Sequence, residues 1–211
     1  MNLSTIYKFA FLCVPKTGST SLKNVLRDHS TISYGWKHRF KHMKAQVFHD
    51  HVMTFHKSAF PTLQIESSCV MREPNDWAYS WYRYRQRPEL LTRSPRKAAM
   101  YTGDISFETF VDHLTRPRSH GNKAFAKIGF QHRYILMDDG SMGVDKIFRY
   151  EDGFGVIEDY FSQKIGTEIS IPNLNKSPNP ALAISDELLV RLENHFDKDW
   201  SIYNSIPVQT S

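Results

Sequence analysis

The stretch that decides the fold covers residues 7–29 and reads YKFAFLCVPKTGSTSLKNVLRDH. Its first part, residues 7–14, is a nearly continuous apolar run, which is typical of a strand buried on both faces of a parallel sheet. After the loop, Leu22, Val25 and Leu26 recur at helical spacing. The stretch therefore predicts a strand, a tight loop and a helix in direct succession.

A second unit of the same kind begins near Gln64, where QIESSCVM runs to Arg72. A helix is expected next, with one aromatic face formed by Trp77, Trp81 and Tyr84. Two such units predict an α/β fold with a central, mostly parallel sheet flanked by helices. The chain has 211 residues, of which 40% are hydrophobic, so one domain over residues 1–211 fits better than two.

Other segments carry weaker patterns. Residues 47–55 (VFHDHVMTF) alternate weakly and predict a strand, and KIFRYED at 146–152 predicts another. Amphipathic helices are expected over 106–115 and 185–204. Residues 86–105 are basic and lack periodicity, which favours a mobile insertion.

Charge, cysteine content and hydropathy indicate which classes of partner and which location to expect. The formal net charge of +5 favours anionic partners such as nucleotides, acidic glycans, nucleic acid or anionic lipid. The two cysteines, Cys13 and Cys69, each lie in an apolar run and are expected to be buried, reduced thiols. The apolar run at 7–14 is too short to span a bilayer. A cytoplasmic protein without integral membrane contact is expected.

The loop at residues 15–20, PKTGST, lies where a buried strand meets the start of a helix. Backbone N–H groups, the helix dipole, one lysine and three hydroxyls together favour an anion site. The loop is not the GxxxxGK[ST] phosphate loop, because Lys16 precedes Gly18. The plainer interpretation is an ordinary turn with a solvated lysine.

The segment PKTGSTSL resembles the 5′-phosphosulfate loop of the sulfotransferases that use 3′-phosphoadenosine 5′-phosphosulfate (PAPS), where PKTGGTSL is typical of carbohydrate-modifying members. Ser19 stands where that pattern has its second glycine. The resemblance implies a P-loop-like fold. It also implies nucleotide contacts from Lys16, Thr17, Gly18, Ser19, Thr20 and Ser21.

The segment CVMREPNDWAYSWY resembles the 3′-phosphate motif of the same family, an arginine at a strand end and a serine eight residues later. These residues are Arg72 and Ser80. An arginine at a strand end can hold a phosphate bidentately, although Arg72 alone also fits a surface salt bridge. Weaker and individually unspecific resemblances to later segments of the family cover most of the chain. They imply Lys176 or its loop neighbours as nucleotide contacts.

The segment FHDHV at 48–52 resembles the His-x-His segment of the uronyl 2-O-sulfotransferase branch, in which a histidine deprotonates the acceptor hydroxyl. On a strand, His49 and His51 would share a face. We expect His51 to be the base and His49 to orient the acceptor. A structural or surface role and a metal site are the alternatives, the latter poorly supported without a cysteine or well-spaced carboxylate nearby.

The sequence thus predicts a sulfotransferase that moves a sulfuryl group from PAPS to a hydroxyl of a carbohydrate or small molecule, without metal. Lys16 would stabilise charge on the departing oxygen. The arginines near 83–97 fit a solvated surface and a lid for an anionic acceptor equally well. A nucleotide kinase would need a GK[ST] loop, and a nucleic-acid-binding protein lacks a recognition motif.

Overall fold

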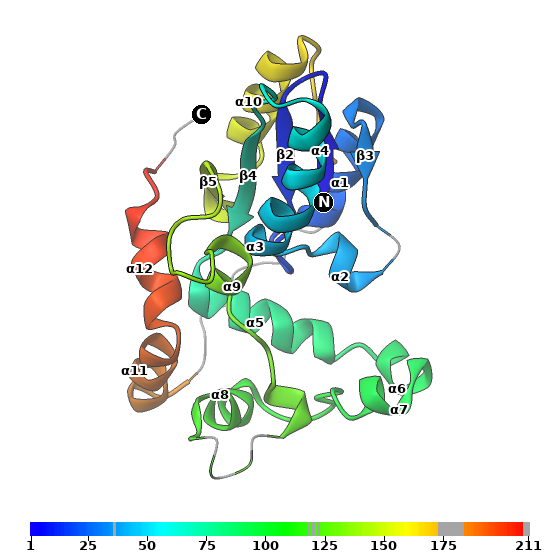
Figure 1. Ribbon diagram of the computed structural model, residues 1–211. Coiled ribbons are helices and arrows are strands. Elements are labelled where there is room, and N and C mark those ends of the chain that lie inside the picture. The colour runs from blue at the N-terminus through cyan, green and yellow to red at the C-terminus, as the bar shows by residue number, and fades with distance from the viewer. Residues whose placement is uncertain (36, 118, 120, 122, 173–183, 209–211) are drawn as a thin grey trace. The chain divides into compact units, whose positions relative to one another are not determined.

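The computed structural model describes residues 1–35, 37–117, 119, 121, 123–172 and 184–208 (Figure 1). These residues form two compact units. The first contains the described parts of residues 1–72, 131–176 and 202–211, and the second those of 73–130 and 177–201. The single domain expected over residues 1–211 stays a prediction.

The first unit is built on a five-stranded sheet in the order β3-β1-β2-β4-β5. The strands are β1 (Asn2–Ser4), β2 (Phe9–Leu12), β3 (Ile32–Ser33), β4 (Glu66–Met71) and β5 (Lys146–Arg149). Strands β2, β4 and β5 pair in parallel, and β1 runs antiparallel to both of its neighbours. The sheet is therefore mixed and mostly parallel, which confirms the predicted α/β class.

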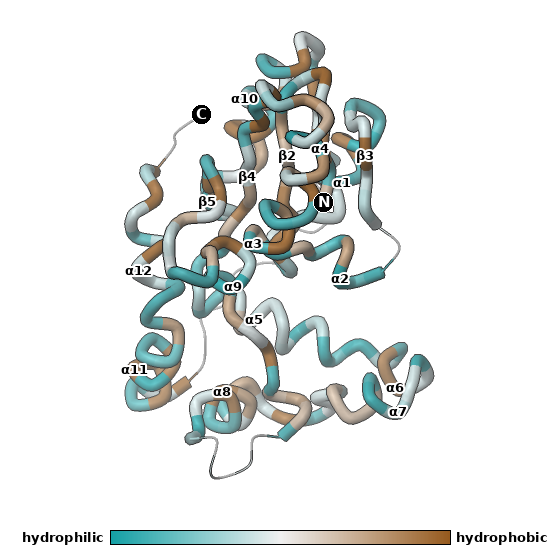
Figure 2. The backbone as a smooth tube through the Cα atoms, viewed as in Figure 1, coloured by the Kyte–Doolittle hydropathy of each residue, from teal (hydrophilic) through white to brown (hydrophobic). Residues whose placement is uncertain are grey.

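Helices cover this sheet (Figure 1). They are α1 (Ser19–Leu26), η1 (Arg27–His29), α2 (His38–Lys41), α3 (Ala45–Val47), η2 (Phe48–Met53), α4 (Thr54–Ala59), α9 (His132–Ile135), η5 (Tyr150–Asp152) and α10 (Gly155–Ile165). On one face, Leu22 of α1 and Phe161 of α10 pack with Phe9 and Phe11 of β2. Burying a side chain of this size stabilises the fold by about 1.5–3 kcal/mol. Figure 2 shows the hydrophobic character along β2.

Strand β1 was not expected, because its sequence NLS is not an apolar run. Asn2 is nevertheless fully buried. Its Nδ2 donates to the carbonyl of Lys23 at 2.9 Å, and its Oδ1 accepts from the Ser33 hydroxyl at 2.9 Å. Hydrogen bonds that satisfy a buried amide make such a strand tolerable, and they leave no trace in hydropathy.

The strand predicted over residues 47–55 is wrong. The chain is helical from Ala45 to Ala59, through α3, the π-helical turn η2 and α4. Buried positions of this segment recur four residues apart, at Phe48, Val52 and His56. They therefore follow a helical period and not an alternating one.

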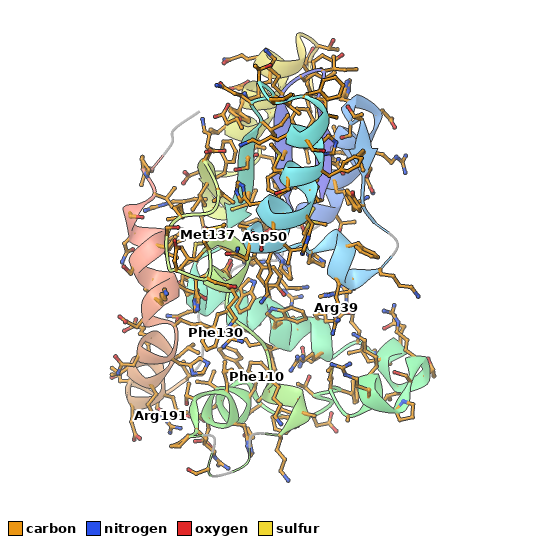
Figure 3. The ribbon with its side chains drawn as sticks, in the orientation of Figure 1. Arg39, Asp50, Phe110, Phe130, Met137 and Arg191 are labelled. Atoms are coloured by element: carbon orange, nitrogen blue, oxygen red, sulfur yellow. The ribbon has the colours of Figure 1, made fainter. Side chains whose placement is uncertain are left out.

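The second unit is helical. Its elements are α5 (Pro74–Arg85), α6 (Glu89–Arg93), α7 (Pro95–Ala98), α8 (Phe107–Thr115), η4 (Ala124–Ala126) and α11 (Asp186–His195). Trp77, Phe110 and Phe196 form the centre of its core, and Phe130 packs at its edge (Figure 3). Helix α12 (Asp197–Ser205) begins in this unit and ends in the first.

The expected elements of the second unit can be compared with the observed helices. Helix α8 is confirmed, and the Ser106 side chain accepts from the Thr109 N–H as its N-cap. Residues 86–105, for which a mobile insertion was predicted, contain the short helices α6 and α7, and Ser94 caps α7. The helix expected over 185–204 is two helices that meet at Phe196. In the described part of the chain, no helix combines the length and apolar character needed to cross a bilayer.

Candidate functional site

The loop after β2 follows a strained path. Lys16 and Gly18 both have φ of 68°. A residue other than glycine incurs a cost of roughly 1–2 kcal/mol in this left-handed region. Strain of this kind persists only where the surroundings enforce it, often at functional sites. The buried Thr17 holds the loop closed, because its Oγ1 donates to the carbonyl of Val14 at 2.9 Å. The Thr17 hydroxyl is thus engaged inside the loop.

Helix α1 begins immediately after Gly18, which supplies no side-chain cap, and no acidic residue lies in its first turn. The first N–H groups of a helix have no partner within the helix, and the helix dipole is positive there. Lys41 Nζ donates to Thr20 Oγ1 at 2.8 Å and adds a cation. Ser19 and Ser21 are buried, whereas Thr20 is exposed. This end of α1 is suited to a phosphate or sulfate group.

Gly18 is required by close approach as well as by conformation. A Cβ atom at this position would lie 2.5 Å from Phe154 Cζ and 3.3 Å from Tyr150 Cε2. Both aromatic rings follow β5 in the chain and pack against the hydrophobic core. Phe154 and Tyr150 therefore form an aromatic floor beneath the loop. The backbone at position 18 can lie against this floor only if the residue has no side chain.

Arg72 directly follows β4 and is buried. Its backbone is fixed by Gln131, which is fully buried: Arg72 N–H donates to Gln131 Oε1 at 3.0 Å, and Gln131 Nε2 donates to the Arg72 carbonyl at 2.7 Å. This paired contact sets the direction in which the arginine side chain leaves the sheet.

The guanidinium of Arg72 lies at the loop. Its Nη1 donates to the carbonyl of Lys16 across 3.4 Å, a long hydrogen bond, and its Cζ lies 4.5 Å from the centroid of the Tyr150 ring. Because β2 and β4 are adjacent parallel strands, their carboxyl ends meet at one edge. The structure thus brings together Arg72 and the loop that contains Lys16.

His42 is a site residue that the sequence reasoning did not select. Its Nδ1 lies 2.7 Å from the carbonyl oxygen of Cys13, the residue directly after β2. A carbonyl oxygen only accepts, so Nδ1 carries the proton and Nε2 of the neutral ring is an acceptor. Burial lowers the pKa of His42 to about 4, opposed by this hydrogen bond and assisted by the neighbouring His38 and Lys41. The ring is therefore neutral at neutral pH.

His49 and His51 do not share a face, because they lie on the π-helical turn η2 and not on a strand. His49 Nε2 lies 2.9 Å from the carbonyl oxygen of Gly143, so that nitrogen carries the proton. The His51 side chain is exposed. Between them, Asp50 is exposed and accepts both of its 2.9 Å hydrogen bonds from Gln46 (Figure 3). The prediction that the His49 and His51 imidazoles share one face is therefore wrong.

Two further contacts were expected, from Ser80 and Lys176. Ser80 lies half-buried on α5, in the second unit. Helix α5 begins at Pro74, and the Glu73 carboxylate caps it by accepting from the Asp76 N–H at 2.6 Å. Lys176 lies outside the described residues.

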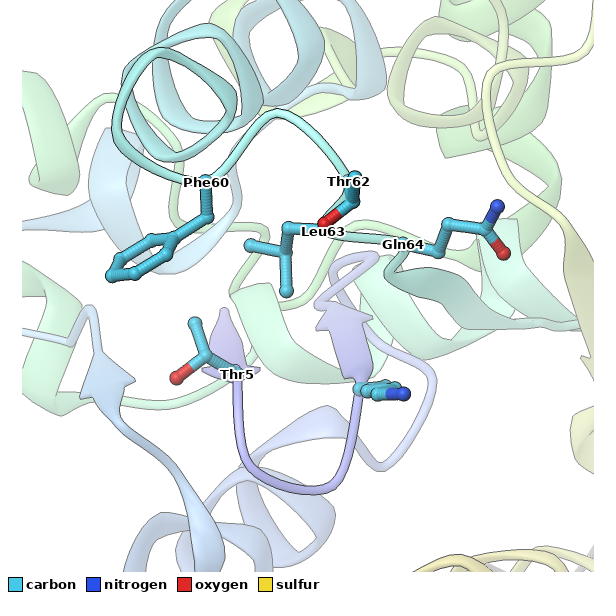
Figure 4. A pocket seen from close by; sticks show the side chains of 6 residues that line it. Thr5, Phe60, Thr62, Leu63 and Gln64 are labelled. Atoms are coloured by element: carbon cyan, nitrogen blue, oxygen red, sulfur yellow. The ribbon is translucent and has the colours of Figure 1, made fainter.

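A cavity of about 450 Å³ lies at the opposite end of the sheet from the loop (Figure 4). It is lined by Thr5, Lys8, Phe60, Thr62, Leu63 and Gln64. Lys8 precedes β2, whereas the loop follows it, so this cavity includes none of the expected site residues. Among the residues that the structure describes, no group of three or more histidine, cysteine, aspartate or glutamate side chains is placed to hold a metal ion.

A scan of known protein-family models and a search of curated proteins both gave no match for this chain. Its function is therefore inferred from the loop, Arg72 and their surroundings.

Proposed function

We propose that this protein is a PAPS-dependent sulfotransferase with a P-loop-like fold. The observation that carries the proposal is the meeting of Arg72 with the Lys16 loop, where Nη1 lies 3.4 Å from the Lys16 carbonyl. PAPS has two anionic ends, a 5′-phosphosulfate and a 3′-phosphate. Two anion-binding elements at the ends of adjacent parallel strands match a ligand of that kind.

The chemistry of the donor set fits the nucleotide. The N–H groups at the start of α1 and the Lys16 side chain would hold the 5′-phosphosulfate. Arg72 would hold the 3′-phosphate through charge-assisted hydrogen bonds. The left-handed Gly18 lets the loop backbone lie directly against Phe154, where a Cβ atom would clash. Ser80 and Lys176 remain expected contacts from the family resemblance alone.

In the proposed reaction, an acceptor hydroxyl attacks the sulfur in line. The new S–O bond forms as the bond from sulfur to the 5′-phosphate oxygen breaks, and adenosine 3′,5′-bisphosphate departs. Lys16 would stabilise the negative charge on that departing oxygen. The hydroxyl proton passes to a base, for which an imidazole is suited.

Two histidines are candidates for that base. The resemblance favours His51, with His49 orienting the acceptor. The geometry favours His42 instead, because the ring is tied to Cys13 at the entrance of the loop and its Nε2 is an acceptor. The low pKa of His42, about 4, keeps the ring unprotonated but makes it a weaker proton acceptor. Variants of His42 and His51 therefore have to be compared directly.

Thermal unfolding with candidate ligands tests the proposal. Adenosine 3′,5′-bisphosphate at 100 times its Kd should stabilise the protein by about 2.7 kcal/mol, and ATP with magnesium or an oligonucleotide should do much less. Arg72→Ala should lose most of this stabilisation, whereas Arg27→Ala, which removes an exposed arginine paired with Asp28, should keep it. Equal stabilisation by ATP with magnesium would favour a kinase instead.

The acceptor can be sought with sulfur-35-labelled PAPS. Glycans, small alcohols and their anionic derivatives would be incubated with the enzyme and separated from the donor. Transfer that Lys16→Ala abolishes and Arg27→Ala preserves would identify the acceptor class. Transfer that survives in Lys16→Ala would contradict the role of the loop.

A further inference from the structure

Tyr150 is the first residue after β5 and lies beside Arg72 for a topological reason. Strands β4 and β5 are parallel, and their register pairs Met71 with Arg149. The next residue on each strand is Arg72 on β4 and Tyr150 on β5. The sheet therefore places these two side chains next to one another at the edge where the loop lies.

The Tyr150 ring lies beside both anion-binding elements. The Arg72 Cζ lies 4.5 Å from the ring centroid, within the range of a cation–π interaction. The edge of the same ring is 3.3 Å from the position that a Cβ would take on Gly18. One aromatic side chain thus contacts the arginine and lies beside the glycine of the loop.

The ring is itself held in place. Phe154 meets it edge to face, with 6.0 Å between the ring centroids and 86° between their planes. Both rings pack against the core of the first unit. A ring fixed by its neighbours restricts the plane of a guanidinium stacked on it, which lowers the entropy lost when the arginine binds a phosphate.

We propose that Tyr150 is a positioning residue that presents the Arg72 guanidinium to the 3′-phosphate of the nucleotide. This inference rests on the proposed function. Tyr150 acts through Arg72, and the aromatic face is the feature that matters. Phenylalanine should therefore replace tyrosine, whereas an aliphatic side chain of similar volume should not.

Nucleotide discrimination is the measurement that separates this role from a general packing role. Adenosine 3′,5′-bisphosphate and adenosine 5′-phosphate differ only in the 3′-phosphate. The Kd of adenosine 5′-phosphate divided by the Kd of adenosine 3′,5′-bisphosphate therefore reports how strongly the protein binds that group. In Tyr150→Leu the ratio should fall by about 2- to 30-fold, the range expected for a lost cation–π contact. Tyr150→Phe should keep the wild-type ratio.

Two further variants make the test specific. Adding Tyr150→Leu to Arg72→Ala should not change the ratio further, because the partner is already gone. Tyr7→Leu makes the same substitution in a tyrosine that packs against the same core, and it should leave the ratio unchanged. Tyr150→Met serves as the aliphatic variant if Tyr150→Leu does not fold.

The outcomes are distinguishable. If Tyr150→Leu weakens both nucleotides equally, or the ratio stays at the wild-type value, Tyr150 only fills space and the inference is overturned. If wild-type protein shows no preference for adenosine 3′,5′-bisphosphate, the proposed function fails first and this inference fails with it.

Discussion

Arg72 and Lys16 are 56 residues apart in the chain, yet Arg72 Nη1 lies 3.4 Å from the Lys16 carbonyl oxygen. The contact places the arginine head group at the base of a loop whose backbone is left-handed at Lys16 and Gly18. Two separate anion-binding features therefore meet at one edge of the sheet.

The Lys16 side chain should raise kcat and lower the free energy of unfolding. Lys16→Ala and Lys16→Gly should both lower kcat by roughly 10²- to 10³-fold, because the charge that stabilises the departing oxygen is lost. Lys16→Gly should be more stable than Lys16→Ala by about 1 kcal/mol, because glycine adopts a φ of 68° without strain. Urea unfolding and initial rates measure the two effects.

Lys8 offers the matched control, since it also has a positive φ, 54°, at the opposite end of β2. Lys8→Gly should likewise be more stable than Lys8→Ala, but kcat should not change. If glycine is no more stable than alanine at either position, strain is not stored in these residues.

Gly18→Ala should destabilise the protein by two separate effects. The left-handed backbone costs roughly 1–2 kcal/mol, and the clash with Phe154 about 1–3 kcal/mol more. Gly166→Ala isolates the first effect, because Gly166 has φ of 74° and open space where its Cβ would lie. Equal losses of unfolding free energy in the two variants would show that the aromatic floor does not constrain the loop.

His42 should make stability depend on pH. Its pKa in the folded protein, about 4, lies below the ordinary value of 6.5, so the unfolded chain binds the proton more readily. The contribution of the neutral ring is complete above about pH 6.5 and is lost as the pH falls toward 4. The difference in unfolding free energy between wild type and His42→Asn should shrink over this window. A difference that is constant with pH would contradict the buried, neutral ring.

The base should be revealed by comparing His42→Ala with His51→Ala. Loss of the true base should lower kcat by roughly 10²- to 10⁴-fold while the affinity for adenosine 3′,5′-bisphosphate stays intact. The structure favours His42 and the family resemblance favours His51. Near-full kcat in both variants would pass the role to His49 or to a carboxylate such as Asp50 or Glu73, and inhibition by EDTA would point to a metal instead.

The strand–loop–helix units at residues 7–29 and 64–85 could be recognised from sequence because buried parallel strands are continuous apolar runs. The same patterns predicted that Lys16 lies in the loop after one buried strand and that Arg72 directly follows another, and the structure has them there. Helix α8 was predictable from an amphipathic stretch. These features depend on neighbouring residues alone.

The rest of the site depends on residues brought together from distant segments. Gln131 holds the backbone of Arg72 across 59 positions, and no local pattern marks it. Tyr150 gains its place from the register of β4 and β5. A strand over residues 47–55 is the wrong prediction because a short stretch with a π-helical turn can match an alternating pattern. On a strand His51 would share a face with His49, whereas on this turn it is exposed.

Calorimetric titration with adenosine 3′,5′-bisphosphate tests the central claim most directly. Wild-type protein should bind it, and Arg72→Ala should bind it more weakly by about 1.5–3 kcal/mol, the loss expected for a charge-assisted contact. Binding of adenosine 5′-phosphate should change little in that variant. An Arg72→Ala protein that binds adenosine 3′,5′-bisphosphate as tightly as wild type would contradict the account.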